Sequence, residues 1–332
     1  MSPKSIEADE KDILLPKKEA FEKLVAPQAE PRKYDIKYLT VAVFLYGHIA
    51  AVYGLYLCFT SAQWKTVLLG IILAYLAGVG ISAGAHRLWS HKAYKVKLPL
   101  EIIIMLLNSL AFQNTATSWV RDHRLHHLYT DTDGDPHNAT RGFFFSHIGW
   151  LLVRKHPEVI KRGKYLDMSD ITNNPVLKFQ KKYAIPLIGA VCFVIPTLAP
   201  VLLWGETFNN AWHITLLRYV YSLHLTFLVN SAAHLWGTKP YDKNIKSSDN
   251  SLVSLITFGD GFHNYHHVFP WDYRSSELGF DSWNLTTWFI NFFARIGWAY
   301  DLKSAPKDLV EMRSRRTGDG TFVAANSKWN RH

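Results

Sequence analysis

Eight histidines stand in three short groups whose spacing suits a metal site. Two groups share the pattern H-x-x-H-H, which on a helix puts all three imidazoles on one face. The third group reads H-x-x-x-x-H, and together the members are His86, His91, His123, His126, His127, His263, His266 and His267. One such group could be an exposed turn, whereas three groups in one chain predict a metal centre.

A ninth histidine, His234, follows Asn230 by four residues and shares its face of a predicted helix. A lone histidine there would ordinarily be a hydrogen-bonded core residue, but eight further candidates favour a ligand. Nine imidazoles are too many for one ion, and two ions with four or five nitrogens each would keep open positions. Imidazole suits iron, copper, zinc and nickel, whereas structural zinc takes fewer ligands and normally includes cysteine.

The elements that must position these ligands are long apolar helices. The chain has 332 residues, of which 48% are hydrophobic and 14% aromatic. Four apolar runs are long enough to cross a bilayer, at about 38–59, 66–85, 183–205 and 212–236. Buried helices of a soluble protein would not need so many long uncharged runs. The sequence therefore predicts an all-α polytopic membrane protein with four transmembrane helices.

Charge orients the predicted helices. The short connections between them hold almost no charge, Lys65 in one and Glu206 in the other, whereas 91–182 and 236–332 are rich in lysine and arginine. The positive-inside rule then places both termini and both large segments in the cytosol. All histidine groups fall on that side, in a helical cap. A redox metal with open positions beside a membrane predicts dioxygen chemistry on a lipid.

Two further stretches are apolar without being clear spans. The run 98–120 contains polar side chains, and His91 precedes it while His123 follows it. Because both histidines must reach one centre, we expect this run to dip into the membrane or to pack under the cap. The stretch 283–300 is expected to form an amphipathic interfacial helix with Trp283, Trp288 and Trp298 as anchors.

The remaining composition narrows the function. Residues 1–37 and 321–332 are expected to be polar tails of a membrane domain that spans 38–320. Cys58 and Cys192 lie in apolar runs, where a packing role is favoured over a disulfide. The net charge of +10 permits an anionic partner, but no phosphate loop or nucleic-acid motif is present. Nucleic acid is therefore not an expected partner.

Several motifs carry a resemblance to a known family. They are H-R-L-W-S-H, H-R-L-H-H, H-N-Y-H-H, D-P-H-N, R-G-F-F-F-S-H-I-G-W-L, N-S-A-A-H and R-T-G-D-G. With these motifs the chain resembles the membrane acyl-CoA desaturases of the stearoyl-CoA desaturase type over nearly all of 38–320. The overall sequence is most similar to insect enzymes, including those of the moth pheromone branch.

The resemblance implies two iron ions held by the nine histidines, with Asn230 contributing through a water. It implies insertion of one cis double bond into a saturated acyl-CoA, in a multi-pass protein of the endoplasmic reticulum membrane. It also implies electrons from NADH through cytochrome b5 reductase and cytochrome b5. Because the sequence has no heme-binding H-P-G-G motif, this electron donor must be a separate protein. The same scaffold could serve an acyl hydroxylase or a conjugase. A metal transporter is a more distant alternative, because it should place ligands near mid-membrane.

The family pattern also implies residues that contact the coenzyme A head. They are Asn114, Arg121, Asp122, Arg154, Lys155, Phe227 and Thr40. Charge alone would add Lys161, Arg162 and Lys164, for which we favour a solvated or lipid-facing basic surface. Asp122 is also a candidate carboxylate for orienting or tuning ligands. His137 and His147 are extra histidines that could support the ligands or be purely structural.

Small side chains form a stripe along the second apolar run. Ala74, Gly78 and Ser82 precede His86 at intervals of four residues. Such a stripe can be a close helix–helix contact. It can equally be the wall of an acyl tunnel that ends at a metal ligand, and relatives that the chain resembles close their tunnel from this span. Neither the position of the double bond nor the preferred chain length follows from the sequence.

Overall fold

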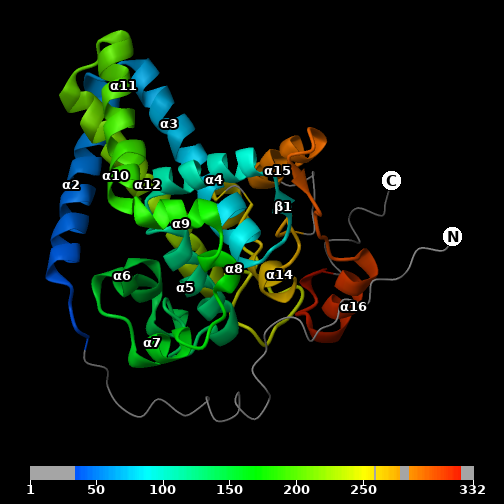
Figure 1. The fold of residues 1–332 in the computed structure, drawn as a ribbon. Coiled ribbons are helices and arrows are strands. Elements are labelled where there is room, and N and C mark those ends of the chain that lie inside the picture. The colour runs from blue at the N-terminus through cyan, green and yellow to red at the C-terminus, as the bar shows by residue number, and fades with distance from the viewer. Residues whose placement is uncertain (1–33, 258, 277–283, 323–332) are drawn as a thin grey trace. The chain divides into compact units, whose positions relative to one another are not determined.

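The computed structural model describes residues 34–257, 259–276 and 284–322, and it is mostly helical (Figure 1). The long helical runs are α2 (Tyr38–Thr60), α3 (Trp64–Val79) with η1 (Gly80–Ser90), α4 (Leu98–Ala111), α5 (Ala116–Tyr129), α10 (Ala184–Ile188) with η4 (Gly189–Val194) and α11 (Ile195–Trp204), and α12 (Phe208–Leu235). Among the predicted tails and anchors, most of 1–37, Trp283 and most of 321–332 lie outside the described residues.

The cap is built from shorter elements. They are η2 (Ala139–Arg141), η3 (Phe145–Gly149), α6 (Trp150–Leu152), α7 (Pro157–Gly163), α8 (Ser169–Thr172), α9 (Pro175–Lys182), α13 (Ser251–Ile256), α14 (His263–Val268), α15 (Leu285–Arg295) and α16 (Lys307–Thr317). Two short strands, β1 (Lys95–Val96) and β2 (Ala299–Tyr300), pair antiparallel. The prediction of helices throughout is confirmed apart from this strand pair.

Three helical runs are long and apolar enough to cross a membrane, Tyr38–Thr60, Trp64–Ser90 and Ala184–Trp204. They contain the first three predicted spans. The second run continues past its predicted end at residue 85, so that His86 lies inside the helix. The fourth predicted span is α12, which is the longest helix but less apolar. It packs against α2, α3 and α11 (Figure 1), and the chain is a helical membrane protein.

Close packing of these helices depends on two glycines. A Cβ atom at Gly54 of α2 would lie 2.3 Å from the carbonyl oxygen of His213 in α12. At Gly80, where α3 passes into η1, a Cβ atom would lie 2.2 Å from the backbone of Leu107 in α4. Any side chain at either position would push the backbones apart. Gly54 therefore allows α2 to approach α12 closely, and Gly80 allows η1 to approach α4 closely.

The third run contains three prolines and a π-helical segment, η4, which leave carbonyls without their usual helical partners. Arg218 of α12 satisfies such carbonyls from a buried position. Its guanidinium donates to the carbonyl of Leu110 at 2.9 Å and to the carbonyl of Cys192. One buried cation thus joins α12, α4 and η4. The thiols of Cys58 and Cys192 are both free, as expected.

The two short connections meet at one end of the helical bundle. The buried Glu206 accepts hydrogen bonds from the backbone N–H of Gln63 at 2.8 Å and from the hydroxyl of Thr66 at 2.7 Å. Asn210 adds a bond to the carbonyl of Ser61 at 3.1 Å. The turns of the two helical hairpins therefore lie side by side. From this end, α12 and the run of α3 and η1 lead to the histidine groups.

The predicted run 98–120 is two helices, α4 and α5, which meet at an angle of 82°. Phe112 and Asn114 at the bend have left-handed φ values of 46° and 67°. The Nε2 atoms of His91 and His123, on either side of the run, lie 2.8 Å apart. The segment therefore returns to the place where it began, which agrees with a dip and not with a further crossing.

The predicted interfacial helix at 283–300 is wrong at its C-terminal end. Helix α15 ends at Arg295 because Gly297 follows in the left-handed region with φ 71°. Trp298 lies beyond this end, is half-buried and stacks on Phe293, with ring centroids 5.8 Å apart. Trp288 on α15 is exposed, as an interfacial anchor should be.

Candidate metal centre

All nine predicted histidines converge in the structure, and they do so as two groups. The five-histidine group contains His86, His91, His123, His127 and His266. The four-histidine group contains His126, His234, His263 and His267. Within each group the candidate ligand atoms all lie within 4.8 Å of one another. Helices η1, α5, α12 and α14 supply these side chains, together with His91 just after η1.

Neighbouring histidines of one motif belong to different groups. His126 and His127 are adjacent on α5, and His266 and His267 are adjacent on α14. Successive side chains on a helix point about 100° apart, so each H-x-x-H-H motif reaches both groups. His126 therefore meets His267 with Nε2 atoms 3.2 Å apart, while His127 meets His266 at 3.0 Å.

The spacing of the nitrogens fits metal ligands. The closest Nε2 pairs within the groups are 2.8–3.2 Å apart. Two nitrogens about 2.1 Å from one ion and at right angles to each other would be about 3 Å apart. Nε2 of His263 lies 2.9 Å from that of His234 and 3.0 Å from that of His267. A single N–H proton could satisfy only one of these contacts, whereas one cation between the rings would satisfy both.

Burial keeps the imidazoles neutral. It lowers the pKa of His91, His263 and His267 well below the ordinary value of 6.5, and the neighbouring rings lower it further. Neutral rings offer nitrogen lone pairs to a cation at neutral pH. Burial likewise lowers the pKa of His137 to about 3.

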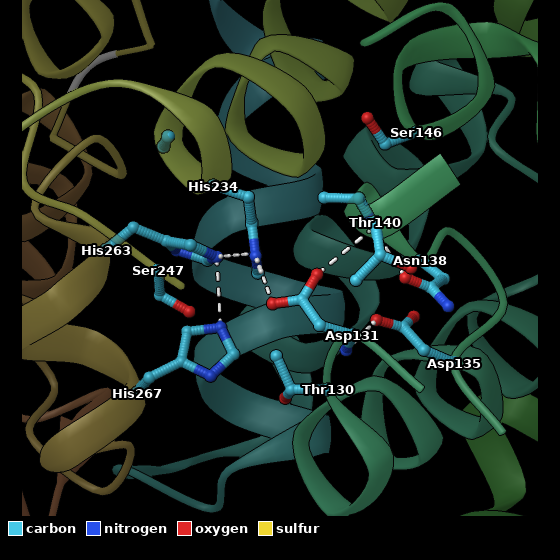
Figure 2. A network of polar contacts seen from close by, with 12 residues as sticks. Thr130, Asp131, Asp135, Asn138, Thr140, Ser146, His234, Ser247, His263 and His267 are labelled. Carbon is cyan, nitrogen blue, oxygen red and sulfur yellow. Dashed lines mark hydrogen bonds and ion pairs between the residues drawn. The ribbon is translucent and has the colours of Figure 1, made fainter. Parts of the chain in front are cut away.

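Carboxylates touch the histidines from the loop that follows α5. Nδ1 of His126 lies 2.9 Å from Asp135, and Nδ1 of His234 lies 3.4 Å from Asp131. Figure 2 shows His234, His263 and His267 turned toward one another, with Asp131 beside His234. An ionised carboxylate only accepts, so Nδ1 of His126 and His234 carries the proton and Nε2 presents its lone pair. Such pairs orient metal ligands.

Asp122, the predicted ligand-orienting carboxylate, has different contacts. Its carboxylate instead contacts the Nζ of Lys155 and lies 3.5 Å from Arg121. Sequence reasoning missed Asp131 and Asp135, although Asp135 opens the D-P-H-N motif. Their role depends on a loop conformation that no spacing rule supplies.

A cavity opens from the centre. Ala74, Gly78 and Ile81 line it from α3 and η1, and Leu225 and Val229 line it from α12. Four histidines, Asn230 and Asp260 complete the wall nearest the centre. Two of the three predicted tunnel residues therefore border an apolar space that ends at the candidate ligands. Ser82, the third, is buried but is not part of this lining.

Sequence reasoning also missed a polar corner of the cavity. Trp119 and Thr226 line it, and Gln113 joins them behind the wall. The Gln113 amide donates to the hydroxyl of Thr226 at 2.8 Å, and the Trp119 indole N–H donates to Gln113 at 3.3 Å. Trp119 also stacks on His123, with ring centroids 4.8 Å apart. These contacts hold the rings of Trp119 and His123 in place where the cavity meets the centre.

The predicted coenzyme A contacts are brought together only in part. Lys155 and Arg121 meet around Asp122, and Arg154 is exposed beside them. Thr40 is in the first turn of α2. The start of α2 lies beside the segment 152–155, because the backbone N–H of Lys37 donates to the carbonyl of Leu152 at 2.8 Å.

The other two predicted contacts differ in exposure. Asn114 is exposed at the bend between α4 and α5. Phe227 is 3% exposed and packs against the rings of His147 and Trp150. Phe227 does not line the cavity wall described above.

The remaining predicted side chains have separate surroundings. His137 lies beside the four-histidine group, with its ring 4.3 Å from that of His126. His147 instead contacts His224 at 2.8 Å and Ser231 at 2.9 Å. Arg162 is buried, pairs with Glu158 at 3.3 Å and covers a tyrosine ring. The expectation of a solvated or lipid-facing Arg162 is therefore wrong.

Comparison with known proteins agrees with this architecture. Residues 62–299 match the family described as Fatty acid desaturase. The chain belongs to the fatty acid desaturase family. It is 65% identical to an Acyl-CoA Delta(11) desaturase of Spodoptera littoralis over 309 residues, 93% of this chain and 91% of the relative.

Two other relatives are similar to the chain over most of their length. A (11Z)-hexadec-11-enoyl-CoA conjugase of Bombyx mori is 64% identical over 98% of this chain and 99% of the relative. Stearoyl-CoA desaturase 5 of Homo sapiens is 49% identical over 89% of each chain. The predicted family, the resemblance to insect desaturases and the oxidoreductase class are confirmed. Histidine clusters able to bind metal are present in this fatty acid desaturase.

Proposed function

We propose that this desaturase binds two iron ions and inserts one double bond into the chain of a saturated acyl-CoA. The observation that carries the proposal is the cavity that begins at the histidine groups and continues between α3 and α12. Its side walls are apolar, and Ala74 and Gly78 leave room for a hydrocarbon chain. A bound chain would pass the candidate ligands before its methyl end reached Ala74.

The residues of this chain position the substrate and exclude water from it. The apolar lining replaces water around the hydrocarbon, and the polar corner of Gln113, Trp119 and Thr226 shapes the cavity beside the centre. The bound iron ions would use dioxygen as the oxidant to remove two hydrogens from an unactivated chain, and two electrons from an external donor would complete the reduction of dioxygen to water. His126 and His234 are held in the ligating tautomer by Asp135 and Asp131, and Asn230 borders the cavity as a candidate ligand through water.

The coenzyme A head is proposed to bind where α2, α5 and residues 152–155 meet. Arg121, Arg154 and Lys155 supply cations that suit phosphates. Asp122 holds Lys155 in place by direct contact, and Thr40 stands on the adjoining turn of α2. Asn114 is also proposed to contact the head. Phe227 is buried and is proposed to support the site from beneath its surface.

Electrons are proposed to come from cytochrome b5 and its NADH-dependent reductase, because the chain carries no heme motif of its own. The protein is proposed to reside in the endoplasmic reticulum membrane with both termini cytosolic. The meeting of the two short connections at the end remote from the histidines supports one shared side for the histidine groups and the large segments.

Expression in a desaturase-deficient cell tests the main proposal. The expected result is a new monounsaturated fatty acid whose bond position and geometry are read by mass spectrometry of derivatised products. The matched control is the same chain with His126→Ala. An expressed, iron-loaded wild-type protein that leaves the fatty acids of the cell unchanged would refute the proposal.

A conjugase is the second candidate, because the relative from Bombyx mori carries that name. The same cells should then be fed a monounsaturated acid. A conjugated diene from that substrate, with no product from saturated chains, would favour the conjugase. A hydroxylated product would favour the hydroxylase alternative.

A further inference from the structure

The two histidine groups differ in the charges that surround them. Two carboxylates contact the four-histidine group from the loop after α5, and Figure 2 shows one of them, Asp131, beside His234. The carboxylate closest to the five-histidine group is already paired with an arginine. Because an ion of higher charge is stabilised more by nearby negative charge, this difference bears on any redox metal bound in both groups.

Asp135 is the better-held of the two loop carboxylates. Its side chain is fully buried, and Oδ2 lies 2.9 Å from Nδ1 of His126. Oδ2 also accepts the backbone N–H of Asp131 at 2.9 Å, and Oδ1 accepts that of His137 at 3.1 Å. These donors fix the carboxylate, and no lysine or arginine of the described chain forms an ion pair with it, so its negative charge acts on the four-histidine group.

Asp131 is held in an unusual backbone conformation. Its φ is 60°, in the left-handed region that glycine adopts more easily than other residues. That conformation directs its carboxylate to Nδ1 of His234 at 3.4 Å, while Oδ1 accepts the backbone N–H of Ala139 at 3.2 Å. The loop therefore sustains backbone strain at the residue that gives the four-histidine group its second negative charge.

Among the residues that the structure describes, no carboxylate gives the five-histidine group a comparable compensation. Oδ1 of Asp260 is 3.9 Å from Nδ1 of His86, beyond hydrogen-bond distance. The same oxygen pairs with the buried guanidinium of Arg87 at 2.7 Å, which cancels its charge. Nδ1 of His266 is buried and has no hydrogen-bond partner. The positive charge of a cation bound here would therefore be left largely uncompensated.

We infer that Asp131 and Asp135 make the two metal positions unequal, so that the four-histidine position retains the ferric ion and the first electron goes to the five-histidine position. That electron converts one ferric ion to ferrous, and an external one-electron donor supplies it. The inference rests on the proposed function only in taking the bound metal to be iron. Asp131 and Asp135 are positioning residues, because each acts through a histidine.

The test uses the full chain loaded with ⁵⁷Fe and reduced with one electron per chain by dithionite. Mössbauer spectra should show ferric and ferrous iron in equal amounts. Asp135→Asn keeps the shape of the side chain but removes its charge, and Asp131→Asn does the same at the longer contact. Each substitution should alter the ferric signal of the half-reduced protein and leave the ferrous signal as it was. With both substitutions, the preference for one position should be lost.

Metal retention gives a second readout and a matched control. Loss of such a carboxylate partner lowers metal affinity by about 10- to 100-fold, so Asp135→Asn should release one of two irons first to a competing chelator. Asp133→Asn is the control, because Asp133 belongs to the same loop but lies 3.6 Å from Arg141. It should change neither the spectra nor the iron content.

Two results would overturn the inference. One is reduction of both irons together in the wild-type chain, and the other is a change in the ferrous signal when Asp135 or Asp131 is substituted. Failure of the proposed function is separate, since it appears as absence of unsaturated product from a chain whose spectra behave as stated. Product formation by a chain whose irons are equivalent would reject the inference alone.

Discussion

Substitution of Ala74 tests whether the cavity between α3 and α12 sets chain length. Ala74 is buried and lines the cavity, twelve residues before His86 on one helical run, which corresponds to a rise of about 18 Å. In Ala74→Tyr an aromatic ring would occupy the far end of this space. Long acyl chains would then lose the place where their last methylenes are buried, while shorter chains would still fit.

The magnitude follows from the displaced hydrocarbon. An aromatic side chain covers about 150–250 Å², the area of about five or more methylenes at about 30 Å² each. We take the displacement of two methylenes as the lower bound. Each methylene kept from apolar surroundings costs about 0.8 kcal/mol, and two cost about 1.6 kcal/mol. We therefore expect kcat/KM for the longest accepted acyl-CoA to fall at least about 15-fold, with little change for chains that end before Ala74.

The assay is the product spectrum from mixed acyl-CoA substrates, measured together with iron content. Ile71→Tyr is the matched control, because Ile71 is on the same helix but 63% exposed on its outer face. It should leave the chain-length profile as in the wild type. A folded, iron-loaded Ala74→Tyr variant with the wild-type profile would refute the reasoning and assign the small-residue stripe to helix packing.

Three further predictions concern the centre, the head group and the fold. His126→Ala should abolish activity and reduce bound iron while the protein still inserts in the membrane; metal analysis that finds one ion or zinc in an active wild-type sample would contradict the two-iron proposal. Arg154→Ala with Lys155→Ala should raise KM for acyl-CoA at least tenfold with little change in protein level, and an unchanged KM would return both residues to a lipid-facing role. Glu206→Ala should destabilise the protein by about 3 kcal/mol, measured as a lower midpoint of thermal unfolding, because buried donors lose an ionised acceptor.

The same carboxylate gives the last prediction a pH signature. Burial alone would raise the pKa of Glu206, but the hydroxyl, amide and backbone donors around it outweigh burial and lower the pKa below its ordinary value of 4.5. Its contribution to stability is therefore complete above the unfolded pKa and is lost as the pH falls through the lower folded pKa. The difference in unfolding midpoint between wild type and Glu206→Ala should be constant from pH 6 to 8 and shrink in acid.

Much of this protein was determined by its sequence. Apolar runs of membrane length and the charges between them follow from one-dimensional patterns, because a helix in lipid must satisfy its own backbone. Short-range spacing also picked out eight of the nine histidines, six of them in H-x-x-H-H motifs that present their rings to one side of a helix, and His234 was added because it was predicted to face the same side. The predictions that failed concern features without such periodicity. Helix α15 stops at Gly297, and Arg162 turns inward to Glu158.

Only the tertiary structure decided how the histidines are shared. His126 and His127 are adjacent in the chain but point about 100° apart, so their partners depend on how α5 lies against α14 and η1. The left-handed turn at Asp131 is equally non-local, because the surrounding loop and α12 hold it in place. Spacing names the side chains that can reach a centre, whereas the packing of helices distant in sequence determines which of them meet and which charges stand beside them.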